Sequence, residues 1–485
     1  MSELILILPI ILPLITALII KFLWKFERIR YLILIAGPIL NIYYISKILT
    51  QFNAIPIKLD LITILSGLNI SLGIEPISMI FLLMVNCLWL IATIYSVGYM
   101  LSNNEKRLDN FFMFFSISIA CANGAALADN LLTLFIFYEL LTLSTYPLVT
   151  HKGDELSKKS GRTYLLILLG TSLCFFLPAI SYVYFLSGSL DFIENGLLMT
   201  TMGVNSISNL QLSILLVLFI FGISKAAIMP FHSWLPAAMV APTPVSALLH
   251  AVAVVKVGVF SIIKVIVYTF GIDLLFDLTI VDLLIILCGF TIIASSIIAI
   301  KQDNLKKLLA YSTISQLSYV IIAILILTPS AIIAATLHLI AHAISKITLF
   351  FAAGAIYTST GYTKISEMDG IGSRLKIVMI GFSIGALSLI GMPILGGFIS
   401  KWYIVESALD ANRWFIILVI VISTLLNIGY FIPIIYKVFF VKNTSKKALK
   451  KLPITINLAI FSCCILIILL FLFPNFFIEV IQNEF

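Results

Sequence analysis

Apolar residues occur in long runs that are separated by short polar segments along the whole chain. About fourteen runs approach the ~20 residues that an α-helix needs to cross a bilayer. Each run is longer than a membrane-spanning β-strand, and lipid offers no partner to an unpaired backbone group, so the runs are predicted to be helices. They lie near residues 3–24, 29–48, 77–100, 110–127, 129–150, 163–186, 209–229, 242–268, 277–300, 304–327, 331–357, 374–400, 413–440 and 453–475. The pattern predicts an all-α polytopic membrane protein with about 14 transmembrane helices.

The connections between these runs are too short to hold a soluble domain, so residues 1–485 are predicted to form one membrane domain. Residues 1–100 would hold helices 1–3 and residues 453–485 helix 14 with a tail. Residues 110–268 (helices 4–8) and 277–440 (helices 9–13) would form two five-helix repeats. An odd number of helices inverts the topology of the second repeat.

Composition and charge agree with a membrane protein and suggest its orientation. Charged residues make up 11% of the chain, whereas soluble domains carry about 25%. Lysine and arginine gather in the loops that follow odd-numbered spans, and the positive-inside rule then places these odd loops in the cytoplasm and both termini on the outer face. We expect an integral protein of a bacterial or archaeal cytoplasmic membrane. The net charge of +8 comes from these loops, so no nucleic-acid partner is predicted.

A few ionisable residues interrupt the apolar runs. A central lysine costs roughly 2.5–3.5 kcal/mol in a transmembrane helix, so a whole set of them indicates function. For one member, such as His250, a structural polar contact is an equally good interpretation. Lys21, Lys264 and Lys437 lie nearer the ends of runs and are expected to extend towards the headgroups. The set within the spans is Glu139, Lys225, His250, Lys256, His338, His342, Lys346 and Lys401.

His338, His342 and Lys346 are spaced by four residues. At about 100° per residue they form one polar stripe along a helix. A zinc site is disfavoured, because Leu339 replaces the catalytic glutamate of H-E-x-x-H and Lys346 would repel a cation. Imidazoles titrate near neutral pH, so the stripe favours proton relay. The cysteines lie inside spans without C-x-x-C spacing, so no metal, cofactor or disulfide framework is predicted.

The first predicted helix break is at Pro230, in the segment Gly222 to Val259. Proline has no N–H, so the carbonyl of Ala226, beside Lys225, would lose its helical partner. Such a carbonyl is tolerated at membrane depth only where it faces protein or water.

The second predicted break is in GMPILGGFISK, where Pro393, Gly396 and Gly397 precede Lys401. Paired interrupted helices in matching positions of two halves are typical of inverted-repeat transporters. The matching tripeptides IMP and GMP at residues 228–230 and 391–393 support the predicted repeats.

The segment KAAIMPFHSWLPAAMVAPTPVSALLHAVAVVKVGVF resembles the signature of the proton-conducting antiporter family, and FYELLTLSTYPLV and HLIAHAISKITLFFAAGAI extend the resemblance across the chain. The family includes subunits of Mrp-type Na⁺/H⁺ antiporters, of respiratory complex I and of membrane-bound hydrogenases. The resemblance implies fourteen helices with helices 7 and 12 broken, and partners among other membrane subunits. It also implies proton and Na⁺ transport.

The resemblance also implies roles for the buried residues. Glu139 matches the glutamate of helix 5 that pairs with the helix 7 lysine, Lys225. Protons would pass from Lys225 through Lys256 to the histidines of helix 11 and on to the last ionisable group. The matching positions are Glu139, Lys225, Lys256, His338, His342 and Lys401, with Lys346 on the same stripe and His232 and His250 as secondary candidates.

Among the members of the family, the D-type chain of Mrp antiporters is the most similar. The family's longer chains are excluded if the chain ends soon after helix 14, and chain M of complex I carries a glutamate where this sequence has Lys401. The neutral Ala237 and Ala238 after the WLP motif favour the D-type chain. The alternative is a proton-pumping chain, N or M, of NADH-quinone oxidoreductase (complex I) or of a membrane-bound hydrogenase.

Two other classes of protein fit the sequence less well. A quinone-binding enzyme chain is disfavoured, because no Rossmann glycine fingerprint, cysteine cluster or haem motif is present. An independent solute carrier would need a large polar cavity at the helix breaks. A line of titratable side chains favours protons over an organic solute.

Overall fold

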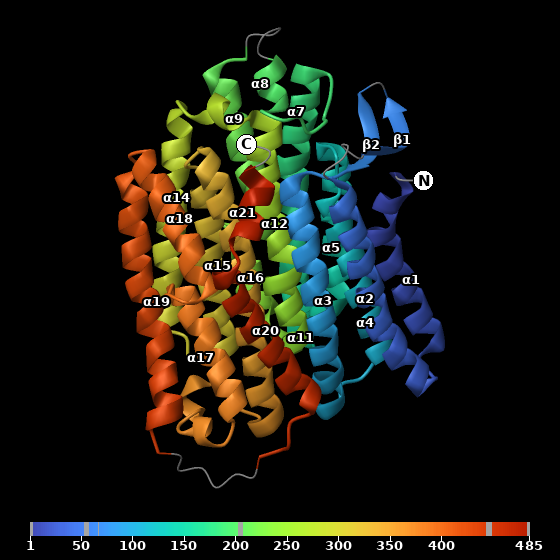
Figure 1. Cartoon of the computed structure of the whole chain (residues 1–485), viewed down its shortest axis with the longest axis vertical. Helices are drawn as coiled ribbons and strands as arrows, with labels where there is room; N and C mark the ends of the chain where they lie inside the picture. The colour runs from blue at the N-terminus through green and yellow to red at the C-terminus, as the bar shows by residue number, and fades with distance from the viewer. Residues whose placement is uncertain (1–2, 53–57, 66, 202–206, 443–448, 483–485) are drawn as a thin grey trace.

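A computed structural model describes residues 3–52, 58–65, 67–201, 207–442 and 449–482. Most of these residues form a bundle of roughly aligned helices (Figure 1). The long uninterrupted helices are α1 (Leu8–Leu23), α2 (Glu27–Phe52), α3 (Pro76–Ser102), α4 (Leu108–Ala126), α5 (Leu131–Val149), α14 (Thr279–Ile300), α15 (Leu305–Ile324), α16 (Pro329–Thr360), α19 (Trp414–Phe440) and α20 (Ile454–Leu472). The prediction of a helical polytopic bundle is confirmed.

Four further spans are interrupted or change helix type along their length. Two of them continue through π-helical turns, and two break completely. They are α6 (Glu155–Thr171) with η2 (Ser172–Phe176) and α7 (Leu177–Ser187); α9 (Asn209–Gly222) with η3 (Ser224–Ala226) and α10 (Trp234–Ala237); α11 (Thr243–Ala247) with η5 (Leu248–Val252), α12 (Val254–Lys264) and η6 (Val265–Phe270); and α17 (Lys376–Ile390) with α18 (Gly396–Asp410).

Eleven helices of the described residues are long and apolar enough to cross a membrane, and two shorter apolar helices are the N-terminal parts of the broken spans. The predicted total of about fourteen also counts α4 and both broken spans, and it stays a prediction. Short helices complete the chain: η1 (Glu3–Ile7), α8 (Leu197–Thr201), η4 (Ala238–Val240), α13 (Ile272–Leu275), η7 (Ile365–Glu367), η8 (Ile371–Ser373) and α21 (Asn475–Gln482).

The sequence did not predict the antiparallel hairpin of β1 (Lys58–Leu65) and β2 (Leu68–Gly73). Strand β2 packs against the bundle through two hydrogen bonds. The amide of Ser71 donates to Thr133 Oγ1 at 3.1 Å, and the amide of Gly73 donates to the carbonyl of Leu127 at 2.8 Å. The hairpin thus supplies partners to polar groups where α4 and α5 meet, at the same end of the bundle as α8 (Figure 1).

The connections between helices fall into two groups. Asn130 pairs with Asp191, which joins two even loops, and Asn304 pairs with Lys364, which joins two odd loops. These contacts agree with helices that cross in alternating directions, as the charge pattern predicts.

Two spans lie at the centre of the bundle. The most apolar windows of Thr243–Phe270 and Pro329–Thr360 are fully buried by other parts of the protein, whereas those of α19 and α20 are 39% buried. The outer helices expose large apolar side chains such as Leu425 and Phe461. Polar groups on the two central spans therefore face protein and not lipid.

A glycine brings the first broken span against a central one. A Cβ atom on Gly258, in α12, would overlap the backbone of Lys225 and Ala226 in η3. The backbone cannot move aside as a flexible side chain can, so this close approach depends on glycine.

Gly258→Ala should therefore destabilise the protein by about 1–3 kcal/mol through overpacking. The matched control is Gly170→Ala in α6, where an added Cβ meets nothing within 4 Å and alanine has the higher helix propensity. Unfolding midpoints of the purified protein in detergent compare the two. Equal midpoints would contradict the close approach.

Candidate functional site

The first helix break begins earlier than the sequence predicted. Helix α9 ends at Gly222, and Ala227 adopts a left-handed conformation with φ 55°, so the chain has left the helix before Pro230. Tertiary contacts supply hydrogen-bond partners to the backbone groups at the break. Trp234 Nε1 donates to the carbonyl of Ser224 at 3.1 Å, and the amide of Lys225 donates to the Tyr138 hydroxyl at 3.1 Å. These hydrogen bonds stabilise a break that begins before Pro230, which the proline alone does not explain.

Lys225 is held in this break by Tyr138. The side chain is fully buried, its Nζ donates to the carbonyl of Tyr138 at 2.8 Å, and the ammonium lies 3.1 Å from the centroid of the Tyr138 ring. A desolvated cation over an aromatic face gains about 2 kcal/mol or more. The tyrosine thus compensates for part of the cost of burying the amine.

The expected contact between Glu139 and Lys225 is not formed. Both carboxylate oxygens of Glu139 are buried and lack a hydrogen-bond partner among the described residues, and no ion pair joins it to Lys225 within 4 Å. Adjacent residues on a helix point about 100° apart, so Tyr138 and Glu139 cannot both face the amine. The charge of Glu139 still acts on Lys225 electrostatically.

The second break surrounds Lys401. Helix α17 ends at Ile390, Gly391 and Ile394 have φ angles of 93° and 73°, and α18 begins at Gly396. Lys401 Nζ reaches back to donate to the carbonyl of Ile390 at 2.9 Å. A cation at a helix C-terminus interacts favourably with unpaired carbonyls and with the helix dipole.

Three of the predicted break residues have different places in this second span. Pro393 stands between the two helices, whereas Gly396 and Gly397 form the first turn of α18. A Cβ on Gly397 would overlap the carbonyl of Ser388 on α17. The amide of Gly397 donates to Ser388 Oγ at 3.2 Å. The glycines therefore let the two halves of the span pack closely.

The central contact joins the two halves of the chain. Lys256 Nζ on α12 lies 2.6 Å from His342 Nδ1 on α16, and both side chains are fully buried. At this distance one proton can be held by either nitrogen. The ring of His342 stacks with that of His338 at a centroid distance of 6.4 Å.

A buried row of side chains is formed by Lys256, His342, His338 and Lys401. Its last step runs from His338 to Lys401. His338 Nδ1 lies 3.0 Å from Ser400 Oγ, next to Lys401 on α18. The Tyr319 ring stacks on His338 at 5.2 Å, and Lys401 Nζ lies 5.3 Å from the centroid of the same ring. The stripe predicted on one helix thus leads to the second break through Ser400 and Tyr319, which the sequence did not single out.

Lys346 and the secondary candidates lie in different surroundings. Lys346 Nζ donates to the carbonyl of Leu309 on α15 at 3.2 Å. His250 is fully buried in the π-helical turn Leu248–Val252, and neither ring nitrogen has a hydrogen-bond partner among the described residues. His232 Nδ1 lies 3.2 Å from the carbonyl of Pro230 in its own loop.

Lys264 does not extend to the headgroups as expected. Its side chain is fully buried, and its Nζ lies 2.9 Å from Glu75 and donates to the carbonyl of Ala128 at 2.6 Å. Asp129 is the next residue after Ala128. Partial burial raises the pKa of its carboxyl, and a hydrogen bond from Lys58 opposes this effect. The position near a helix end gave no sign of this ion pair, because Glu75 is far away in the sequence.

The row of nitrogen atoms differs from a set of ion pairs. Among the described residues, Lys225, Lys256, Lys346 and Lys401 have no carboxylate within 4 Å, and no group of three or more His, Cys, Asp or Glu is placed to hold a metal ion. Amines and imidazoles that donate to each other and to carbonyls can exchange protons but offer few ligands to a hard cation.

The Tyr138–Lys225 contact can be measured with a double-mutant cycle. Tyr138→Leu should destabilise the normal chain more than the Lys225→Met chain, with a coupling free energy of about 1–2 kcal/mol for a buried cation over a ring. Unfolding in detergent gives the four stabilities. Additivity within about 0.5 kcal/mol would contradict the contact.

Two family models match the chain. The model described as "NADH:quinone oxidoreductase/Mrp antiporter, TM" matches residues 128–427. A second, described as "NADH-Ubiquinone oxidoreductase (complex I), chain 5 N-terminus", matches residues 63–112. The first match covers more than half of the chain and includes both breaks and the central contact.

Curated relatives come from both branches of this description. The NADH-quinone oxidoreductase subunit N of Desulforudis audaxviator (strain MP104C) is 31% identical over 370 residues, which are 76% of this chain and 72% of the relative. A protein of Staphylococcus aureus (strain MRSA252) named as antiporter subunit mnhA2 is 27% identical over 489 residues and 92% of this chain. The chain spans 58% of the length of that antiporter subunit.

Two solved structures share the fold. A chain of the Mrp complex from Dietzia sp. DQ12-45-1b has a TM-score of 0.87 at 18% identity, with 100% of this chain and 97% of that chain covered. A chain of the membrane-bound sulfane sulfur reductase, an archaeal respiratory membrane complex, has a TM-score of 0.85 at 23% identity, with coverage of 98% and 96%. The family model over residues 128–427 and the 31% identity to subunit N identify the chain as an integral membrane protein that belongs to the NADH:quinone oxidoreductase/Mrp antiporter transmembrane family.

Proposed function

We propose that the chain is the proton-translocating subunit of a multisubunit Na⁺/H⁺ antiporter of the Mrp type, where it would serve as the D-type chain. The observation that carries this proposal is the buried row that runs from Lys256 through His342 and His338 to Lys401 at the second broken helix, with Lys256 Nζ 2.6 Å from His342 Nδ1. Protons would move along the row between nitrogen atoms. The chain would need no cofactor of its own.

The packing of the row supports protons over an organic solute. His338, His342 and Lys256 are at most 2% exposed, and Lys401 is 7% exposed. The Tyr319 ring of α15 stacks on His338, and His338 stacks on His342 within α16. A carrier of organic solutes would need open space around its polar groups.

The first step of the proposed pathway is an electrostatic switch at Lys225. A carboxylate stabilises the charged form of a neighbouring lysine, and burial without one favours release of the proton. Glu139 acts on Lys225 from beyond ion-pair distance, so a change in its charge or position would alter how firmly the lysine holds its proton. Tyr138 would keep the amine in place during this change.

The neutral Ala237 and Ala238 after the WLP motif favour the D-type chain. The alternative is an N- or M-type chain of NADH-quinone oxidoreductase (complex I) or of a hydrogenase. The 31% identity to a subunit N favours this alternative.

Orientation, repeats and partners complete the proposal. The positive-inside rule would place the odd loops in the cytoplasm and both termini outside. Residues 110–268 and 277–440 would be inverted repeats, since each contains one broken span with a buried lysine. Other membrane subunits would pack on the lipid-facing helices.

Lys225→Met and Lys401→Met should each lower proton transport by about 100-fold, because a positioned proton-transfer group contributes about 10²–10⁴-fold. Methionine keeps the length of the side chain but carries no proton. The measurement is the change in lumen pH after Na⁺ is added to inverted vesicles that contain the whole complex. The control is Lys376→Met, an exposed lysine at the start of α17; normal transport by Lys401→Met would refute the pathway.

Purification of the complex from native membranes through a tag on this chain separates the two candidate functions. We expect other Mrp subunits and no flavin or iron–sulfur protein in the mass spectrum. Redox subunits would assign the chain to complex I or a hydrogenase, and recovery of the chain alone would count against both.

A further inference from the structure

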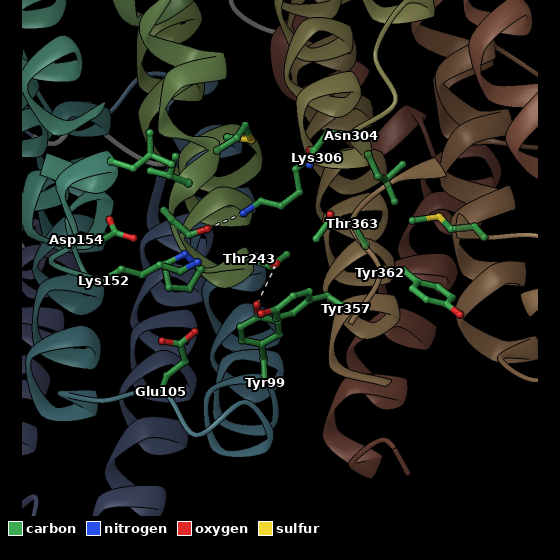
Figure 2. A pocket seen from close by; sticks show the side chains of 18 residues that line it. Tyr99, Glu105, Lys152, Asp154, Thr243, Asn304, Lys306, Tyr357, Tyr362 and Thr363 are labelled. Carbon is green, nitrogen blue, oxygen red and sulfur yellow. Dashed lines mark hydrogen bonds between the residues drawn. The ribbon is translucent and has the colours of Figure 1, made fainter. Parts of the chain in front are cut away.

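A polar cavity opens on the odd-loop face of the bundle. Its volume is about 290 Å³, which is enough to hold several water molecules. Figure 2 shows charged and hydroxyl side chains around it that come from parts of the chain far apart in the sequence. The residues that define this loop cavity are Tyr99, Glu105, Lys152, Asp154, Thr243, Asn304, Lys306, Tyr357, Tyr362 and Thr363, with apolar residues between them.

Every connection that contributes to the loop cavity belongs to the odd set. Glu105 lies between α3 and α4, Lys152 between α5 and α6, Asn304 between α14 and α15, and Thr363 after α16. These are the loops whose basic residues predict the cytoplasmic side. The cavity therefore faces a single aqueous compartment.

Lys306 is one of the residues that line the loop cavity. It is half-buried in the first turn of α15, its Nζ donates to the carbonyl of Ala241 at 2.6 Å, and no carboxylate lies within 4 Å of it among the described residues. Lys152 and Glu105 are its charged neighbours. Burial raises the pKa of the Glu105 carboxyl, and the positive charges of Lys152 and Lys306 oppose this effect.

The same lysine lies next to the buried row. One turn along α15 from Lys306, the carbonyl of Leu309 accepts the hydrogen bond from Lys346. His250, which has no hydrogen-bond partner among the described residues, lies in the electrostatic field of Lys346, Lys306 and Lys256. Lys306 and the hydrogen-bond partner of Lys346 thus lie one helical turn apart on α15.

We propose that the loop cavity is the entrance through which protons reach the buried row, and that Lys306 carries them across its inner boundary. The neutral amine of Lys306 takes a proton from water in the cavity, and the ammonium then gives it through intervening water to the amine of Lys346. Lys306 returns to its neutral form and the proton is conserved. This inference rests on the proposed proton transport and adds its point of entry.

A purely structural role for Lys306 makes a different prediction. If the lysine only anchors the loop before α11 through the carbonyl of Ala241, arginine can replace it, because a guanidinium also donates hydrogen bonds. Arginine does not release its proton in proteins. Lys306→Arg should therefore stop a relay and preserve an anchor.

The test compares Lys306→Arg and Lys306→Gln with Lys307→Arg and Lys307→Gln, at the exposed neighbouring lysine, in inverted vesicles that contain the whole complex. We expect a loss of at least about 10-fold in the initial rate of proton transport for both Lys306 variants. Both Lys307 variants should transport normally, and recovery of partner subunits shows that assembly is intact. Normal transport by Lys306→Arg would overturn the relay.

A second arm does not depend on Lys306. Thr363→Cys places a thiol at the exposed rim of the loop cavity, and a membrane-impermeant cationic methanethiosulfonate added from the odd-loop face should block transport. The unsubstituted chain with the same reagent is the control, and an unchanged rate in labelled Thr363→Cys would refute the entrance. If Lys401→Met is inactive but Lys306→Arg and labelled Thr363→Cys transport normally, only the proposed entrance is wrong. If Lys401→Met transports normally, the proposed function itself is wrong.

Discussion

The burial of amines without carboxylate partners is the constraint on which the rest of this structure depends. A lysine in the middle of a membrane costs roughly 2.5–3.5 kcal/mol, even when the surroundings relax around it. Here Lys225, Lys256 and Lys346 are fully buried, and each is compensated by an aromatic face, an imidazole or a backbone carbonyl. Such partners lower the cost of burial but do not fix the proton as a carboxylate would. The same surroundings that make the lysines tolerable therefore leave them able to exchange protons.

The fold provides partners for two of the lysines by interrupting helices beside them. The C-terminus of α17 leaves a carbonyl free for Lys401, and the break after α9 orients Lys225 towards Tyr138. Irregular backbone is tolerated at membrane depth only where it faces protein or water. The first break is buried over residues 222–229, whereas Met392 and Ile394 in the second break are exposed. Gly258 and Gly397 hold the broken segments against their neighbours. Burial, breakage and close packing are thus parts of one arrangement.

The sequence predicted what depends on composition and missed what depends on contacts. Apolar runs of bilayer length placed the helices, and rare charges inside those runs identified Lys225, Lys256 and Lys401. Tyr138 and Tyr319 gave no signal, because an aromatic residue is ordinary in an apolar helix. The start of the first break at Ile223 is set by Trp234 and Tyr138 rather than by the proline nearby. Lys264 was assigned to the headgroups from its position alone, and its partner Glu75 could be found only from the fold.

The central claim is that protons cross the protein along the row and that its two halves are joined at Lys256 and His342. The most direct measurement follows proton and Na⁺ fluxes together in the same vesicles that contain the complete complex with Lys256→Met. Methionine removes the exchangeable proton from the central contact but preserves the length of the side chain. The account predicts that both fluxes fall together, because the cut row can no longer couple them. A proton flux that continues at the normal rate would contradict it.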